Sequence, residues 1–149
     1  MLAGEYCNRD VIIVGKTDSV VKAAKLMRKY HVGDVLVIEP RHSERVPIGI
    51  LTDRDIVIGA IANDLDANDT IVEDIISFKM VTVNENEDLM ITIKRMRVNG
   101  IRRIPVVNKN GGLVGILAVD DVLDVITEQL VDIDQIIIKE QKIEKELRV

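Results

Sequence analysis

The sequence is organised around the stretch GILTDRD, residues 49–55, in which an apolar strand pattern passes directly into a helical pattern. The stretch GILAVDD, residues 115–121, repeats the glycine, the two aliphatic residues and the final aspartate. It carries Ala118 where the first copy carries Thr52. We therefore predict two strand-to-helix corners that the fold presents to a ligand, and the two corners differ at this hydroxyl.

A longer repeat surrounds the two corners. In the first copy the pattern predicts strand 11–14, helix 19–30, strand 35–38, strand 48–51 and a helix from residue 52 to about residue 63. A polar hairpin loop is expected from Pro40 to Pro47. The same order recurs 69 positions later before the hairpin and 66 positions later after it, where residues 108–112 form a tighter turn. The difference therefore falls in a hairpin, where insertions are tolerated.

The repeat predicts an α+β fold of two β-α-β-β-α units, residues 1–66 and residues 67–128. A three-stranded sheet needs a partner for its second face, so we expect the units to pack about a pseudo-twofold axis with a cleft between them. Residues 129–149 form a helical extension with apolar side chains at three- and four-residue spacing. We expect this helix to pack on a second chain in a homodimer, and a helix folded back on its own domain is the alternative. Its charged end, residues 139–148, is expected to be frayed.

Composition excludes several classes of function. Aromatic residues make up 2% of the 149 residues, so stacking of nucleic-acid bases on exposed rings is nearly excluded. A net charge of −5 argues against non-specific binding to nucleic acid or to an anionic membrane. With a single cysteine, no signal segment and no apolar run long enough to cross a bilayer, we expect a cytoplasmic protein.

The sequence contains no recognisable catalytic or metal-binding motif. His31 and His42 are isolated, Cys7 lacks metal-ligand spacing, and neither a Ser-His-Asp set nor a glycine-rich phosphate loop is present. We therefore expect a protein that is not an enzyme and requires no cofactor.

The first corner has two chemical interpretations. Thr52 and Asp55 match a capping box, in which the hydroxyl accepts from a first-turn N–H and the carboxylate accepts from the cap residue. Alternatively, the helix start offers N–H groups to a phosphate, and the carboxylate accepts hydrogen bonds from the two hydroxyls of a ribose. Asp121 lacks the hydroxyl partner and is either a ligand or an ordinary first-turn acid.

The ordered pattern resembles a tandem pair of cystathionine-beta-synthase (CBS) domains, also called a Bateman module, over residues 2–128. The resemblance is carried by the helix ending at Met96, GIRRIPVV at 100–107, the Asn-Gly-Gly turn, LVGIL at 113–117 and Asp121, each with its first-copy counterpart. The first copy departs by having Leu36 where the family often has proline. The second departs by having Ala118 at the hydroxyl position.

The resemblance implies an energy-sensing regulatory module that binds an adenine nucleotide, such as AMP, ADP or ATP, in the cleft and signals to an unidentified target protein. It assigns Asp55 and Asp121 to the ribose and Thr52 to the sugar and phosphate. Arg102 and Arg103 would face the phosphate and supply the positive charge at the Asp55 site, with an ion pair to Asp34 or simple exposure at the strand edge as the alternatives.

The resemblance also implies two base pockets, for which core packing is the alternative. The residues are Met80, Val81 and Ile101 for the Asp55 site, and Ile12, Ile13 and Val32 for the Asp121 site. Phe78 could touch a base but is more often a core residue. The other hypotheses are a scaffolding dimer with an empty cleft and a protein that binds S-adenosylmethionine-type compounds or nucleic acid.

Overall fold

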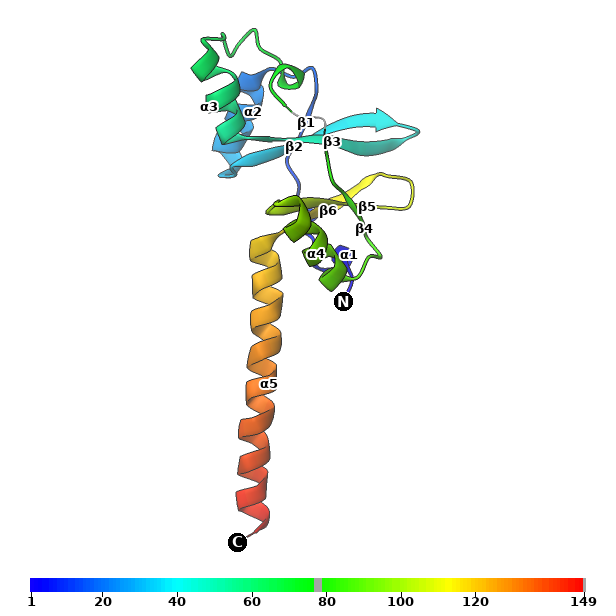
Figure 1. Ribbon diagram of the computed structural model, residues 1–149, viewed down its shortest axis with the longest axis vertical. Coiled ribbons are helices and arrows are strands. Elements are labelled where there is room, and N and C mark those ends of the chain that lie inside the picture. The colour runs from blue at the N-terminus through cyan, green and yellow to red at the C-terminus, as the bar shows by residue number, and fades with distance from the viewer. Residues whose placement is uncertain (77–78, 149) are drawn as a thin grey trace.

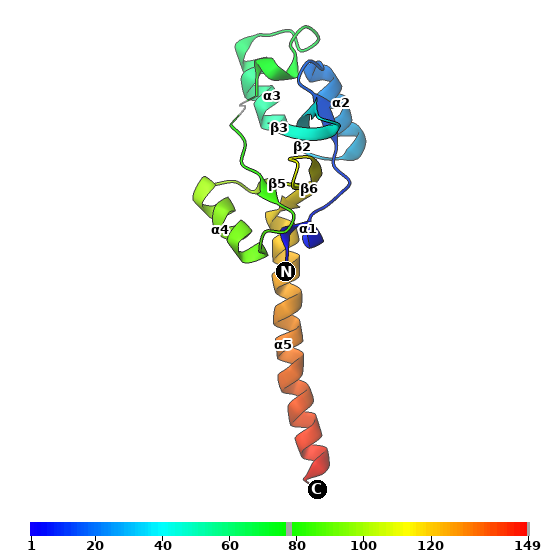
Figure 2. The ribbon, with the colours of Figure 1, turned by 90° about the vertical axis from the view of Figure 1, so that its right-hand side faces the viewer.

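The computed structural model describes residues 1–76 and 79–148. Two three-stranded sheets, with strand orders β1-β2-β3 and β4-β5-β6, lie next to each other. Helices α2 and α3 lie on the far side of one sheet, α4 and α1 lie beside the other, and the long helix α5 projects away from both (Figure 1; Figure 2). The α+β fold of two repeats is confirmed.

The two units have the same order of elements and the same strand pairing. The first contains β1 (Ile13–Gly15), α2 (Val20–Tyr30), β2 (Asp34–Arg41), β3 (Glu44–Thr52), α3 (Asp53–Gly59) and a 3-10 turn (Ile61–Asn63). The second contains β4 (Val83–Asn84), α4 (Leu89–Asn99), β5 (Arg103–Val107), β6 (Leu113–Ala118) and α5 (Val119–Leu147). In each unit the first pair of strands is parallel and the second is antiparallel. A short helix, α1 (Ala3–Tyr6), and a 3-10 turn, Val72–Asp74, complete the chain.

The equivalent helices α2 and α4 begin and end through local side-chain chemistry. The Ser19 hydroxyl accepts from the Lys22 N–H at 3.1 Å, and the Asp88 carboxylate accepts from two first-turn N–H groups of α4. At the other end, His31 and Gly100 adopt left-handed φ angles of 54° and 63°. Such residues end a helix by turning the chain away from its axis. The boundaries predicted for the first helix are therefore close to those observed.

The predicted hairpin is present, but the loop expected from Pro40 to Pro47 was too long, because both prolines lie inside strands. Strand β2 continues to Arg41 and β3 begins at Glu44, so only two residues, with φ angles of 48° and 66°, make the turn. Two left-handed residues suit the twist of a tight hairpin. Pro40 lies beyond the last residue of β2 that pairs with β1, and Pro47 lies on the edge strand β3. Both positions tolerate a residue without an N–H.

Two predicted helix ends also differ from the structure. Helix α3 ends at Gly59 instead of near Asn63, because the Asn63 side-chain amide donates to the Ile58 and Gly59 carbonyls at 3.2 and 3.0 Å. Carbonyl groups left without a partner at a helix end are thereby satisfied. Helix α5 continues through Leu147, so residues from 139 onward are helical and not frayed as expected.

The central strands are covered on both faces. In β2, consecutive residues Val35, Leu36 and Val37 are 0–1% exposed, and in β5 Ile104 and Val106 are also fully buried. Successive residues of a strand point to opposite faces. Val35 and Val37 belong to the core beneath α2 and α3, so the opposite face, with Leu36, is covered from the side of the other sheet.

Each hydrophobic core includes chain from outside the span expected for its unit. Ala3 of α1 is fully buried in the core of the second unit, and the Asn8 N–H donates to the Ile116 carbonyl of β6 at 2.8 Å. Val72 is fully buried in the core of the first unit. The division of the chain at residues 66 and 67 stays a prediction, although both cores draw on residues beyond it.

Polar contacts join the two units at their hairpins. The Glu44 carboxylate at the tip of the β2–β3 hairpin accepts from the Asn108 amide at 3.2 and 3.3 Å and from the Asn110 amide at 3.4 Å. Both asparagines belong to the β5–β6 turn, so the two hairpins are tied together. None of the described helices, α5 included, combines the length and apolar composition needed to span a bilayer.

Leu51 and Leu117 occupy equivalent places in the two cores, and both are 0% exposed. Replacing either with alanine is expected to lower the free energy of unfolding by about 2–5 kcal/mol, because it leaves a cavity. Val98→Ala is the control, since Val98 is 79% exposed and should change stability by less than about 0.5 kcal/mol. Urea denaturation followed by circular dichroism measures these values. A loss at the leucines no larger than at Val98 would contradict the core assignment.

Candidate functional site

The first corner forms the capping box that its sequence predicts. Strand β3 ends at Thr52, whose hydroxyl accepts from the Asp55 N–H at 3.0 Å. The Thr52 N–H donates to Asp55 Oδ2 at 2.9 Å. This arrangement engages one carboxylate oxygen and the acceptor capacity of the hydroxyl. The second carboxylate oxygen and the hydroxyl proton are not part of the box and could still serve a ligand.

The second corner keeps half of this arrangement. The Ala118 N–H donates to Asp121 Oδ2 at 2.9 Å, but Ala118 has no side-chain acceptor for the first turn of α5. Asp121 is therefore fixed at the base of α5 by its backbone partner alone. Asp121 is therefore a first-turn acid that caps its helix, as one of the two interpretations expected. The other carboxylate oxygen of Asp121 is outside that contact.

Both corners are fixed to the preceding strand by equivalent backbone hydrogen bonds. The Asp53 N–H donates to the Gly33 carbonyl, and the Val119 N–H donates to the Arg102 carbonyl, both at 2.9 Å. The strand pairs match as well, with Asp34 opposite Thr52 in one sheet and Arg103 opposite Ala118 in the other. The two corners are thus equivalent positions of the duplicated fold.

A cavity of about 310 Å³ lies beside the second corner, between the two units. It brings together three residues that the resemblance assigned to the Asp121 site, Ile12, Val32 and Asp121, whereas Ile13 is not in its lining. Arg103, which was expected to serve the Asp55 site, also lines this cavity. The remaining lining residues are Asn8, Asp10, Val11, His31, Gly33, Asp34, Ile116, Ala118 and Asp120. The lining of this cavity combines apolar side chains with carboxylates.

The cavity also contains an ion pair across the two units. Arg103 Nε lies 2.9 Å from Asp34 Oδ2, which is the alternative that the sequence left open for this arginine. Burial raises the pKa of the Asp34 carboxyl above its ordinary value, against the lowering effect of Arg103, and nearby Asp53 raises it further. In this structure Arg103 is bound to a protein carboxylate through Nε, so a phosphate would bind the remaining guanidinium N–H groups or displace Asp34.

The residues expected for a base pocket at the first corner are not gathered in the same way. Val81 and Ile101 pack against the core of the second unit, as the core-packing alternative expects. Met80 lines a different cavity, of about 470 Å³, which does not include Thr52 or Asp55. The other residues of that cavity are Lys16, Glu39, Arg41, Pro47, Ile48 and Thr82. Phe78 lies outside the described residues.

Sequence reasoning missed Asn8, Asp10 and Asp120 in the lining of the cavity. Asn8 reaches it because the N-terminal segment pairs with β6, where the Ile116 N–H donates to the Asn8 carbonyl at 2.9 Å. A Cβ at Gly115 would lie 2.5 Å from that carbonyl, so a side chain there would prevent the approach. The glycine of the repeat is therefore the one signal that another backbone comes close.

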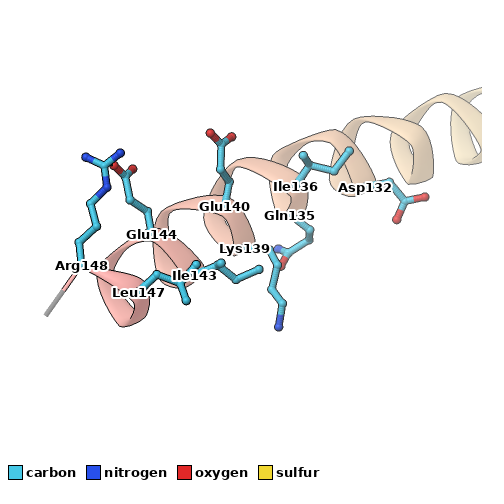
Figure 3. Close-up of a pocket in the computed structure, with 9 residues that line it drawn as sticks. All are labelled: Asp132, Gln135, Ile136, Lys139, Glu140, Ile143, Glu144, Leu147 and Arg148. Carbon is cyan, nitrogen blue, oxygen red and sulfur yellow. The ribbon is translucent and has the colours of Figure 1, made fainter.

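A larger hollow lies away from this cleft. It covers about 940 Å³ along α5, between Asp132 and Arg148, and every residue that lines it belongs to that helix (Figure 3). A surface made by one helix is an open face, not an enclosed pocket. Among the described residues no group of three or more His, Cys, Asp or Glu side chains could hold a metal ion.

Comparison with known proteins gives the family. The family model for the CBS domain matches residues 3–59 and again residues 72–128. This chain belongs to the CBS-domain family. The two matches make it a tandem CBS-domain pair, which confirms the resemblance found in the sequence.

The relatives of this CBS-domain pair include curated and solved proteins. An uncharacterized protein of Methanopyrus kandleri is 37% identical over 122 residues, which span 82% of this chain and 61% of that protein. The crystal structure of Hypoxic Response Protein I with two coordinated zinc ions has a TM-score of 0.72 and 28% identity, covering 83% of this chain and 98% of that one. A CBS domain protein from Pyrobaculum aerophilum complexed with AMP has a TM-score of 0.71 and 26% identity, covering 81% and 89%.

The two corners predict opposite effects of the same exchange. Thr52→Ala removes a cap acceptor and is expected to lower the free energy of unfolding by about 0.5–2 kcal/mol. Ala118→Thr supplies the missing acceptor at an extended residue, with φ −102° and ψ 157°, and is expected to raise it by about 0.5–1 kcal/mol. Urea denaturation of both variants beside the wild type checks the pair. A destabilising Ala118→Thr would show that the second corner is not equivalent to the first.

Proposed function

We propose that this CBS-domain pair is a regulatory module that binds an adenine nucleotide of the AMP, ADP or ATP type in the cleft between its repeats and signals to a partner protein. The observation that carries the proposal is the 310 Å³ cavity, whose lining combines apolar Ile12 and Val32 with Asp121. Its volume is at the lower end of the range for small-molecule pockets. A structural relative that was solved with AMP supports the same ligand class.

Each residue has a defined task in the proposal. The side chains of Ile12, Ile13 and Val32 pack against the adenine at the Asp121 site, and Met80, Val81 and Ile101 do so at the Asp55 site. Asp121 and Asp55 accept hydrogen bonds from the two ribose hydroxyls, and Thr52 contacts the sugar and phosphate. Arg102 and Arg103 bind the phosphate through their planar guanidinium groups.

The Asp34–Arg103 ion pair supplies a link from ligand to conformation. It joins equivalent positions of the two repeats, at 2.9 Å. A phosphate that takes Arg103 from Asp34 removes a contact between the repeats and leaves a buried carboxylate without its cation. The ligand then has a different affinity for different arrangements of the repeats, which is the requirement for shifting their populations. The target protein reads that shift, and no catalytic step or required cofactor is part of this function.

Binding should depend on the two aspartates. Asp121→Ala and Asp55→Ala are each expected to weaken binding of AMP, ADP or ATP at their own site at least tenfold, because a charge-assisted hydrogen bond contributes about 1.5–3 kcal/mol. Isothermal titration calorimetry with these nucleotides and with S-adenosylmethionine measures the affinities. Asp124→Ala is a matched control, since it removes the same charge from α5 one turn further on.

The outcomes separate the hypotheses. Equal nucleotide affinity in all four proteins would contradict the assigned ribose contacts and leave the aspartates only their capping role. Absence of binding to the wild type would favour the scaffolding dimer with an empty cleft. Binding of S-adenosylmethionine without any nucleotide, or of nucleic acid alone, would favour the third hypothesis.

We also propose that the protein is a homodimer joined through α5. Beyond Ile126 the helix leaves the core, and its apolar side chains are 43–79% exposed. One stripe of this surface has the three- and four-residue spacing of a coiled-coil seam. Its apolar members are Leu123, Ile126, Leu130, Ile133, Ile137 and Leu147, with Ile136 and Ile143 beside them. Such a stripe is covered most simply by the same stripe of a second copy.

The charges of α5 favour an antiparallel pair. Residues 119–138 contain six acidic side chains and no basic one, whereas residues 139–148 contain four basic and three acidic ones. A parallel pair would place the two acidic halves side by side. An antiparallel pair places the basic end of each helix along the acidic half of its partner, so opposite charges oppose each other.

Ile137→Lys is expected to convert the dimer to a monomer at micromolar concentration, because it buries an ammonium group in the seam. Ile138→Lys is the matched control, since Ile138 lies on a neighbouring face of the helix and is exposed to the same degree, 52% against 53%. Light scattering coupled to size-exclusion chromatography measures the mass. A monomeric wild type, or equal effects of the two lysines, would contradict the proposed seam.

The direction of pairing has its own test. In a Cys7→Ser background, oxidation of a mixture of Leu123→Cys and Leu147→Cys chains should give a cross-linked heterodimer, whereas each variant alone should not cross-link. Cross-linking of Leu123→Cys with itself would establish a parallel pair instead.

A further inference from the structure

We infer that the two halves of the cleft select adenosine compounds of different charge: the Asp55 half takes a compound with phosphate groups, and the Asp121 half takes one whose 5′ substituent has no net negative charge. This inference rests on the proposed adenosine-type ligand. It adds a division of labour between the two sites and names the residues that set it.

The structure shows which residues of the two halves are equivalent. Val14 pairs with Val37 and Val83 pairs with Val106, which fixes an offset of 69 positions before the hairpins. Asp34 is opposite Thr52 and Arg103 is opposite Ala118, which fixes an offset of 66 after them. By these offsets, Asp10 corresponds to Lys79, Gly33 to Arg102, Asp34 to Arg103, Arg54 to Asp120 and Asp55 to Asp121.

The charges are inverted at three of these five pairs: Asp10 and Lys79, Asp34 and Arg103, and Arg54 and Asp120. The Asp121 cavity is lined by four carboxylates, Asp10, Asp34, Asp120 and Asp121, and by one arginine, Arg103. Arg103 is already paired with Asp34 at 2.9 Å. Its charge therefore does not offset the other three carboxylates of the lining. His31, the remaining titratable side chain of the lining, is exposed to solvent. Carboxylates that line the same cavity repel a phosphate group.

The Asp55 half carries cations where the other half carries anions. Lys79 stands at the position of Asp10, Arg54 at that of Asp120, and Arg102 at that of Gly33, so three cations accompany the two first-turn acids Asp53 and Asp55. Arg54 and Arg102 are both exposed, on the first turn of α3 and next to the start of β5. Guanidinium and ammonium groups are the side chains that bind phosphate. The Asp34–Arg103 pair lies between the halves and is neutral overall.

The two ligand classes follow from this inversion. At the Asp55 half, each added phosphate gains attraction from Arg54, Lys79 and Arg102. At the Asp121 half, the same phosphate meets Asp10 and Asp120, whereas an uncharged thioether or a cationic sulfonium at the 5′ carbon is tolerated or attracted. The ribose acceptor is the same in both halves, so the charges around it, and not the sugar contact, distinguish the compounds.

The test measures each site alone. Calorimetry uses Asp55→Ala to leave the Asp121 site and Asp121→Ala to leave the Asp55 site, with adenosine, AMP and S-adenosylmethionine as probes at low salt. At the Asp121 site, adenosine and S-adenosylmethionine are expected to bind at least tenfold more tightly than AMP. At the Asp55 site, AMP is expected to bind at least tenfold more tightly than adenosine.

Exchanging the equivalent charges provides the matched variants. Asp120→Arg, added to the Asp55→Ala protein, should raise the affinity for AMP relative to that for adenosine at least tenfold. Arg54→Asp, added to the Asp121→Ala protein, should remove the preference for AMP. Both residues are exposed, so these exchanges should leave the urea midpoint nearly unchanged. The same AMP-to-adenosine ratio at both sites, or ratios that the exchanges do not move, would overturn this inference while leaving the proposed function intact. Binding of none of the three probes to the wild type would overturn both.

Discussion

A sheet of three short strands cannot cover both of its own faces, and this constraint organises the molecule. Helices α2 and α3 cover one face of the first sheet, yet Val35, Leu36 and Val37 of its central strand are all buried. The second face must therefore be covered by the other repeat. Because burial of that face holds the repeats together, the cleft between them is a consequence of the same packing, and its residues come from both repeats.

The pseudo-twofold arrangement brings equivalent residues towards one another, which restricts what they can be. Asp34 and Arg103 occupy the same position of the repeat and meet at 2.9 Å. Two aspartates or two arginines there would repel each other in a half-buried place, whereas one of each forms an ion pair. Divergence of the two copies is thus a physical requirement at the axis. The same divergence further out, at Asp10, Arg54, Lys79 and Asp120, gives the cleft an acidic side and a basic side.

Local patterns in the sequence predicted the parts of the fold that depend on local chemistry. The helix over residues 19–30 and the box between Thr52 and Asp55 were found because the spacing of apolar side chains and the capping residues determine them. The pairing of Asn8 with Ile116 could not be found in this way, because the partners are far apart in sequence and the segment of Ala3 and Gly4 carries no periodic pattern. The extended strands through Pro40 and Pro47 were missed because a proline signals a loop unless its missing N–H falls where no partner needs it.

The candidate site shows the same division. The Asp121 cavity gathers Ile12, Val32 and Arg103 because the repeat itself places them, and a repeat can be read from sequence. The sequence could not show which of its two available partners Arg103 binds, because the choice depends on the burial of Asp34 and on the distance across the axis. The carboxylates Asp10 and Asp120 become part of the site only when two distant segments are brought together, and no local pattern marks them.

The cleft and the apolar stripe are connected through the single helix α5. Asp121 lies in the first turn of α5 and is held by the Ala118 N–H, while Val122 and Val125 fasten the same end of the helix into the core. From Leu130 onward the side chains of α5 are exposed, over roughly 25 Å at 1.5 Å per residue. A ligand that pulls on Asp121 therefore acts where α5 is anchored, and a small change of angle at the anchored end becomes a larger displacement at the other end. A site at the base of the helix and a second copy along its length would be coupled through this geometry, with no further domain required.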